Sequence, residues 1–216
     1  MSIKLFWEDT YRAQNEAVVT SIDGDVVTVD KTVAFAYPGG QVFDTGTLGG
    51  FPILNARYEN RELYYTLPAG HTLNKGDAVT VIIDWDRRYA LMKLHFVTEL
   101  LLVVLGKNYG RHKITQADIL PDKAIVGFDW NIDIAGTFPT LNEELKKLIA
   151  DDIPIISAYQ DRENEKRYWE IPGLAKVPCG GTHLKRTGEI GPFVLKKIPA
   201  EKGKAALEIE LTPGNG

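Results

Sequence analysis

One stretch of the chain has the periodicity of a long helix docked on a hydrophobic core, and the remaining segments must fold around it. Between Trp85 and Leu105, apolar side chains and one threonine recur at spacings of three and four. These positions are Leu91, Leu94, Thr98, Leu101, Leu102 and Leu105. Asp84 is a candidate N-cap and Gly106 is the expected end. The sequence therefore predicts one helix over residues 85–105.

The residues before this helix predict a small domain of short strands. No segment between Lys4 and Asp84 sustains a helical period, and β-branched runs alternate with turn signals. Asp23-Gly24 lies between two such runs and predicts a type I′ hairpin, which needs positive φ at both central residues. A second hairpin is expected at Glu59-Asn60, and residues 79–83 read as a closing strand. We therefore expect a small N-terminal β-barrel-like domain over residues 1–84.

The residues after the helix alternate between strand and helix patterns. We expect a strand over residues 125–134, a helix over 141–150 and a strand over 153–158. Residues 194–198 and 206–211 would form a terminal hairpin. The predicted class is α+β, with residues 85–216 forming a two-layer α/β domain in which the long helix packs on a mainly antiparallel sheet.

Composition excludes several classes of protein. The chain has 216 residues, of which 44% are hydrophobic and 25% charged, so it is neither disordered nor collagen-like. Its longest uninterrupted apolar run, residues 100–105, is far shorter than the ~18 to 20 residues of a membrane span. The first residues lack the apolar core of a secretory signal, so we expect a cytoplasmic protein without a membrane partner. The single cysteine, Cys179, cannot form an intrachain disulfide.

Charge is distributed unevenly. The net charge of −4 gives no general case for binding a polyanion, yet residues 173–204 contain seven basic and two acidic side chains. This segment has two explanations, a surface that faces a polyanion or a solvated hairpin. Nothing in the sequence requires self-association.

Two short spacings bring together side chains that can bind a metal. His95 and Glu99 are four residues apart on the long helix and project from the same face. Cys179 and His183 flank Gly180 and Gly181, and two glycines allow a turn sharp enough for a thiolate and an imidazole to converge. Each pair also has a simpler explanation: a hydrogen-bonded His-Glu contact, or a buried cysteine with an incidental histidine.

Taken together, the helix pair and the loop pair could bind one ion. A soft thiolate and two imidazoles argue against Mg²⁺ or Ca²⁺ and favour Zn²⁺. His71 and His112 have no comparable partner in the sequence and are expected on the surface.

The motifs resemble a known family. Cys179-Gly-Gly-Thr-His183, its continuation from Thr187 to Gly191, and a helix motif that begins at His95 are similar to the editing domain shared by alanyl-tRNA synthetases and the freestanding AlaX proteins. The upstream matches are Asp30-Lys-Thr32, Phe35, Tyr37-Pro38-Gly39-Gly40-Gln41, Asp44-Thr-Gly46, residues 85–89 and Met92. The resemblance covers nearly the whole chain, without an aminoacylation domain, and looks like the medium-length AlaX type.

The resemblance implies a trans-editing hydrolase of translation fidelity. Its substrate would be the acceptor end of tRNA(Ala) carrying serine, or glycine, in place of alanine, and its cofactor Zn²⁺. The implied metal ligands are His95, Glu99, Cys179 and His183, with His95 and Glu99 also catalytic. The implied substrate-binding residues are Thr32, Gly39, Gly40, Gln41, Gly180, Gly181 and Thr182. The basic residues that would contact tRNA are Lys176, Lys185, Arg186, Lys196 and Lys197.

The helix motif departs from the family at one position. The family has His-x-x-x-His, whereas this chain has a carboxylate at the second position, Glu99. Glu99 could bind the zinc and reduce its Lewis acidity, or stand off the metal as a general base toward a water in the fourth ligand position. Alternatively, the change marks lost activity, in which case the protein is a metal-binding homologue that binds aminoacyl-tRNA or a free amino acid. The family's longer glycine run is also shortened here, to Gly39-Gly40.

Overall fold

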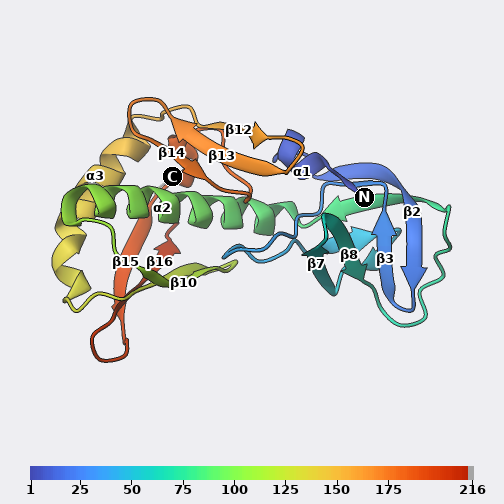
Figure 1. Cartoon of the computed structure of the whole chain (residues 1–216), viewed down its shortest axis with the longest axis horizontal. Helices are drawn as coiled ribbons and strands as arrows, with labels where there is room; N and C mark the ends of the chain where they lie inside the picture. Colours follow the sequence, from blue (N-terminus) through green and yellow to red (C-terminus); the bar gives the residue numbers. More distant parts are fainter. Residues whose placement is uncertain (214–216) are drawn as a thin grey trace. The chain divides into compact units, whose positions relative to one another are not determined.

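The computed structural model describes residues 1–213, which form two compact units. The first unit comprises residues 1–38 and 42–89, and the second comprises residues 39–41 together with the described residues from 90 onward. One long helix and mainly antiparallel sheets confirm the α+β class (Figure 1). The short segment 39–41 belongs to the second unit although its chain neighbours belong to the first.

The first unit is built on a seven-stranded antiparallel sheet with the order β6-β5-β9-β2-β3-β8-β7. The strands are β2 (Gln14–Asp23), β3 (Val26–Val29), β5 (Gly46–Leu48), β6 (Phe51–Pro52), β7 (Asn55–Glu59), β8 (Glu62–Thr66) and β9 (Ala78–Ile83). Beside it, β1 (Ile3–Lys4) pairs in parallel with β4 (Lys31–Thr32), and α1 spans Leu5–Glu8. Among the described residues the edge strands β6 and β7 do not pair with each other, so the expected barrel-like sheet is open rather than closed.

The two predicted hairpins form, each with its turn one residue later than expected. The β7–β8 turn consists of Asn60 and Arg61, whose φ angles are 51° and 64°, as a type I′ turn requires. The β2–β3 turn consists of Gly24 and Asp25, and only Gly24 has a positive φ, 57°. The type I′ geometry expected at Asp23-Gly24 is therefore found in the other hairpin.

The long helix α2 spans Trp85–Tyr109 and continues beyond its predicted end. Asp84 is its N-cap, since the carboxylate accepts a hydrogen bond from the backbone N–H of Arg87 (3.1 Å). Gly106 adopts the helical conformation, and the helix ends before Gly110, whose φ is +83°. Contacts of the last turn with a second helix outweigh the roughly 1 kcal/mol helix penalty of Gly106.

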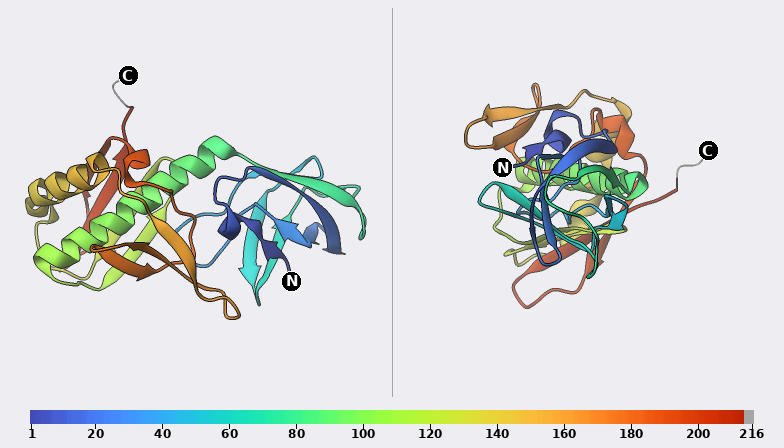
Figure 2. Two further views of the ribbon diagram at one scale, coloured as in Figure 1. Left: turned by 90° about the horizontal axis from the view of Figure 1, so that it is seen from above. Right: turned by 90° about the vertical axis from the view of Figure 1, so that its right-hand side faces the viewer.

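That second helix is α3, Phe138–Ala150, which lies beside the C-terminal end of α2 (Figure 2). Glu144 of α3 accepts hydrogen bonds from Lys107 (2.9 Å) and Asn108 (2.8 Å) of α2. The helix expected over residues 141–150 thus begins three residues earlier, with Pro139 in its first turn, where a missing N–H costs nothing.

In the second unit, α2 runs between two antiparallel sheets (Figure 1). One sheet has three strands, β12 (Ile156–Asp161), β13 (Lys166–Ile171) and β14 (Ala175–Pro178), and the other has the order β10-β11-β16-β15. The strands of the latter are β10 (Ile114–Ile119), β11 (Lys123–Phe128), β15 (Phe193–Ile198) and β16 (Ala205–Leu211). By length and hydropathy α2 could cross a membrane, but most side chains of its apolar window are buried within the protein, as in a core helix.

Two predicted strands in this unit need correction, and the terminal hairpin does not. The strand expected over residues 125–134 ends at Phe128, and a 3₁₀ helix, η1 (Ile134–Thr137), follows. The strand expected over 153–158 is β12, displaced by three residues. The terminal hairpin is confirmed as β15 and β16.

Candidate metal centre

The helix pair is positioned by α2. His95 and Glu99 lie one turn apart, and the imidazole Nε2 is 3.4 Å from a carboxylate oxygen of Glu99. Both side chains are largely enclosed, since His95 is buried and the Glu99 side chain is only 15% exposed. His95 and Glu99 therefore share one face of α2, as predicted, and this face points into the interior of the second unit.

The loop pair follows strand β14. The backbone N–H of Cys179 donates to the carbonyl of Arg167 (3.0 Å), which extends the β13–β14 pairing to the cysteine. The Cys179 Sγ lies 3.5 Å from His95 Nε2. The turn through Gly180 and Gly181 then places His183, which is buried, beside the same atoms.

The four side chains form one cluster. One ligand atom from each of His95, Glu99, Cys179 and His183 lies within 4.8 Å of the other three. Two imidazoles, a thiol and a carboxylate are a donor set suited to a four-coordinate Zn²⁺, so the residues fit the metal that the sequence suggested. The spacing argument thus brought together four residues that the structure does place together.

A backbone contact fixes the orientation of the His95 ring. Its Nδ1 lies 3.3 Å from the Thr182 carbonyl oxygen, to which it can donate, and Nε2 then faces Cys179 and Glu99. This is the arrangement in which an outer hydrogen bond sets the imidazole nitrogen offered to a metal.

His183 is oriented by a residue that the sequence did not identify. Its Nδ1 lies 3.2 Å from the Ser157 hydroxyl on β12. Its ring stacks on that of His95, with centroids 5.0 Å apart, and meets the edge of Phe96 at 6.0 Å. The imidazole is thereby held on three sides, and no local motif around Ser157 signals this role.

The charges of the cluster favour a cation. Burial lowers the pKa of His95, but the influence of Cys179 and Glu99 outweighs burial and raises the pKa of His95 to about 10. Burial, together with the positive charges of His95 and Arg167, lowers the pKa of His183 well below its ordinary value, so this imidazole is neutral. A neutral imidazole such as His183 is the form that binds a metal, and the raised pKa of His95 shows that its surroundings favour a positive charge at this place.

Glu99 is ionised within the cluster. Burial raises the pKa of its carboxyl group, but contacts with His95, Cys179 and the indole of Trp169 outweigh burial and leave the pKa below its ordinary value. Trp169 is fully buried on β13 and packs edge-on against Phe96, with centroids 5.1 Å apart. It is the second residue near the cluster that sequence reasoning missed.

The glycine segment expected at the substrate pocket contacts β10 and the metal loop, and its place at the pocket stays a prediction. Gly40 approaches β10 so closely that a Cβ there would lie 2.1 Å from the Ala117 carbonyl oxygen. Gln41 is bound to Thr182 twice: its amide nitrogen donates to the threonine hydroxyl (2.8 Å), and its amide oxygen accepts from the threonine N–H (3.1 Å). Both side chains are buried, so Gln41 locks the metal loop in place.

Comparison with known proteins supplies the family. The threonyl and alanyl tRNA synthetase second additional domain matches residues 170–206. An alanyl-tRNA editing protein AlaX-M of Saccharolobus solfataricus is 31% identical, over 98% of this chain and 99% of its own length. This chain belongs to the AlaX-M family of alanyl-tRNA editing proteins. Another such protein, of Pyrococcus horikoshii, is 29% identical over 98% of both chains, and the alanine–tRNA ligase of Ignicoccus hospitalis is 31% identical over 92% of this chain but only 24% of the ligase.

The family motif after the metal loop has a structural role here. The Thr187 hydroxyl donates to the Leu148 carbonyl at the end of α3 (2.6 Å) and accepts from the Ile153 N–H (2.8 Å). The Glu189 carboxylate accepts from the backbone N–H groups of Lys185 and Arg186, at 3.1 and 3.0 Å. The segment therefore fixes the exit of the metal loop against α3.

Thr32, expected beside the amino acid, belongs to the first unit. It is fully buried, and its hydroxyl oxygen accepts hydrogen bonds from the Tyr65 O–H and the Ala34 N–H, both at 3.0 Å. Its assignment to the aminoacyl pocket stays a prediction.

The basic residues expected to contact tRNA lie on several elements, and most have acidic neighbours. On β15, Lys196 pairs with Glu210, and Lys197 pairs with Asp133 at 2.9 Å. Arg186 pairs with Asp152 at 2.6 Å. Lys176 on β14 is 3.4 Å from Glu170 and lies over the Tyr168 ring. Lys185 follows the metal loop. Their contact with tRNA stays a prediction.

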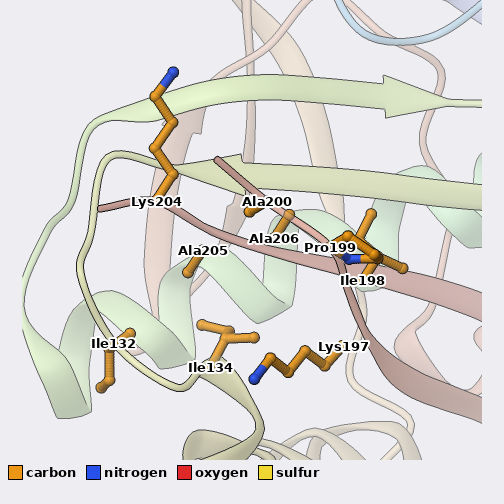
Figure 3. Close-up of a pocket in the computed structure, with 9 residues that line it drawn as sticks. All are labelled: Ile132, Ile134, Lys197, Ile198, Pro199, Ala200, Lys204, Ala205 and Ala206. Atoms are coloured by element: carbon orange, nitrogen blue, oxygen red, sulfur yellow. The ribbon is translucent and has the colours of Figure 1, made fainter. Parts of the chain in front are cut away.

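Two of the cavities among the described residues of the second unit bear on the site. One, of about 490 Å³, is lined by Ile134, Lys197 and the β15–β16 connection, and none of the four cluster residues lines it (Figure 3). The other, of about 680 Å³, includes Glu99 in its wall and lies against the second half of α2 and strand β14. Only the second adjoins the metal cluster.

Replacing Gly181 with alanine is expected to weaken metal binding about 10- to 100-fold, the usual effect of disturbing a residue that orients a ligand. A Cβ at Gly181 would lie 2.1 Å from His95 Cε1, so the ring or the loop must move. Metal affinity is measured by competition with a chromophoric chelator. Gly136→Ala is the matched control, because nothing lies within 4 Å of its Cβ position, and unchanged affinity in Gly181→Ala would contradict the orientation argument.

Proposed function

We propose that this protein is a zinc-dependent trans-editing hydrolase that removes serine, or glycine, from mischarged tRNA(Ala). The observation that carries the proposal is the largely enclosed His95–Glu99–Cys179–His183 cluster, in a chain that matches AlaX-M relatives along almost its full length. Hydrolysis of an ester that is already activated needs no covalent nucleophile from the protein.

The roles of the chain's own residues follow from the geometry. His95, Cys179 and His183 would hold the zinc, which when bound supplies Lewis acidity toward the ester carbonyl and toward water. Glu99 is the cluster residue that also lines the adjoining cavity, from which water and substrate can reach it. Its lowered pKa keeps it ionised at neutral pH, the state in which a carboxylate accepts a proton from attacking water.

Serine selectivity is part of the proposal. A site that hydrogen-bonds the serine hydroxyl penalises alanine, which lacks it and leaves a buried polar group without a partner. From the family resemblance we propose that Thr32 and the Gly39–Gln41 segment line this pocket. The two Gln41–Thr182 hydrogen bonds support this for Gln41, because they hold it against the metal loop.

The first test is the rate at which the purified protein deacylates Ser-tRNA(Ala), measured beside Ala-tRNA(Ala) and with a chelator. Fast loss of serine that the chelator suppresses, with alanine retained, supports the proposal. If folded, zinc-loaded protein gives no loss above the uncatalysed rate, the protein is instead a binding module for aminoacyl-tRNA or an amino acid.

Glu99→Gln is expected to keep the zinc and to lower the deacylation rate about 100-fold or more, because the amide has the shape of the carboxylate but cannot take up a proton. Zinc content by atomic emission and the single-turnover rate are measured together. Loss of zinc in this variant would make Glu99 a ligand instead. Glu99→His restores the family's second imidazole, and it is the matched comparison, in which zinc content is expected to stay at one ion per chain.

A further inference from the structure

The Trp169 indole is a fully buried hydrogen-bond donor beside the metal cluster. Its Nε1 makes no hydrogen bond with the residues that the structure describes. The same is true of His183 Nε2, which is the ring nitrogen left for the zinc because Nδ1 faces Ser157. Zinc ligation accounts for this histidine nitrogen but not for the indole, whose N–H is only a donor. Since a buried indole N–H ordinarily has an acceptor, Trp169 needs one in this cluster.

Packing brings this donor to Glu99. The indole meets the ring of Phe96 edge-on, with centroids 5.1 Å apart. Phe96 and Glu99 are three residues apart on α2, so they are neighbours on the surface of the helix. Burial raises the pKa of the Glu99 carboxyl group, whereas contacts with His95, Cys179 and this indole lower it. The carboxylate is therefore an acceptor beside the indole N–H.

The place of Trp169 on β13 requires an apolar side chain but not a donor. Arg167, Trp169 and Ile171 alternate into the interior, and Trp169 is opposite Val177 of β14 in the sheet. A phenylalanine would fill much of the same space without a polar atom that needs a partner. The N–H therefore stabilises the fold only if it is paired, and an ionised acceptor gives the stronger bond.

We propose that Trp169 is a positioning residue for Glu99: its indole N–H donates to one carboxylate oxygen and leaves the other to accept a proton from water. The last side-chain torsion of Glu99 is broad and nearly two-fold, so its rotation can turn an oxygen toward the donor. The bond then gives the carboxylate one orientation in the cluster, as outer hydrogen bonds do at metal sites. This inference rests on the proposed function, in which Glu99 is the base.

The first test uses the indole N–H signals in the proton–nitrogen NMR spectrum of the full-length protein. The chain has four tryptophans, and Trp169→Phe identifies the signal of Trp169 by removing it. Glu99→Gln is expected to move that signal upfield and to leave the other three in place, because a neutral amide accepts a weaker hydrogen bond than a carboxylate. A Trp169 signal that does not respond to Glu99→Gln would overturn the proposal.

The second test is a double-variant cycle on the single-turnover deacylation rate. Trp169→Phe keeps an aromatic ring against Phe96 but removes the donor, and it is expected to lower the rate about 10- to 100-fold with zinc content unchanged. In the Glu99→Gln background the same change is expected to lower the rate less than about two-fold, because the base is already absent. Trp130→Phe is the matched control. The Trp130 indole is half-buried and stacks on His112, with centroids 3.8 Å apart, and its loss is expected to change neither rate nor zinc content.

The outcomes separate this inference from the proposed function. Equal losses of rate in the two backgrounds would show that Trp169→Phe acts through packing, and loss of zinc would show that it acts on the metal, so either result overturns the proposal. If serine is released but neither the signal nor the cycle couples Trp169 to Glu99, the hydrolase stands and the positioning role is wrong. If Glu99→Gln moves the signal but the wild type releases no serine, the hydrogen bond stands and the hydrolase is wrong.

Discussion

His183→Ala is expected to reduce bound zinc from about one ion per chain to a small fraction of that and to lower the deacylation of Ser-tRNA(Ala) at least about 100-fold. His183 is buried, and its pKa is far below the ordinary value because of burial and of the positive charges of His95 and Arg167. It therefore offers a neutral imidazole at neutral pH. Its removal leaves His95, Cys179 and Glu99. If Glu99 then binds the zinc as the third ligand, it can no longer accept a proton from water as the proposed base.

Zinc content is measured by atomic emission after gel filtration, and activity by release of labelled serine. His71→Ala is the control, because it removes the same side chain from the first unit, where the imidazole contacts the Gly24 carbonyl at 3.2 Å and the ring of Phe51. Full zinc content with lost activity in His183→Ala would show that His183 acts on the substrate and not on the metal. Unchanged values of both would remove the cluster from the proposed function.

The metal cluster was predictable because each half of it is local in sequence. A spacing of four on a helix puts His95 and Glu99 on one face, and two glycines let Cys179 and His183 converge. The two halves were joined by the hypothesis that all four side chains, each a suitable zinc ligand, bind one ion. The structure places all four within 4.8 Å of one another.

The residues that orient the cluster were not predictable in the same way. Ser157 and Trp169 lie on β12 and β13, and they reach the site only because these strands pair beside α2. The alternation of Arg167, Trp169 and Ile171, all buried, was a signal for β13, but a charged residue at a core position obscures it.

The fold shows the same division between local and long-range information. The Asp84 cap and the terminal hairpin follow from neighbouring residues, and both are confirmed. The end of α2 depends on contacts with α3, which lies about 30 residues further along the chain, and the prediction stopped at Gly106. The first sheet is open because its edge strands, β6 and β7, do not pair with each other among the described residues. No local sequence pattern encodes such long-range pairing.

Arg88→Met is expected to destabilise the first unit by about 3 to 5 kcal/mol, because it leaves the Asp44 carboxylate buried without its countercharge. Arg88 is fully buried, and its Nε donates to Asp44 (2.9 Å) while Nη2 contacts the other carboxylate oxygen and the Val33 carbonyl. Asp44 also accepts from the Phe35 N–H at 2.7 Å, so the pair ties the start of α2 to two loops of this unit. The free energy of unfolding is measured by urea denaturation followed by tryptophan fluorescence.

Two further variants separate the charge effect from lost packing. Arg88→Met combined with Asp44→Leu removes both charges, and it is expected to recover a large part of the lost stability, since an apolar pair avoids the cost of a lone buried ion. Arg57→Met breaks the exposed pair with Glu59 (3.7 Å), and it is expected to change the free energy of unfolding by less than about 0.5 kcal/mol. If the double variant is as unstable as the sum of its single changes, the loss comes from the backbone contacts of Arg88 and not from the stranded Asp44 charge.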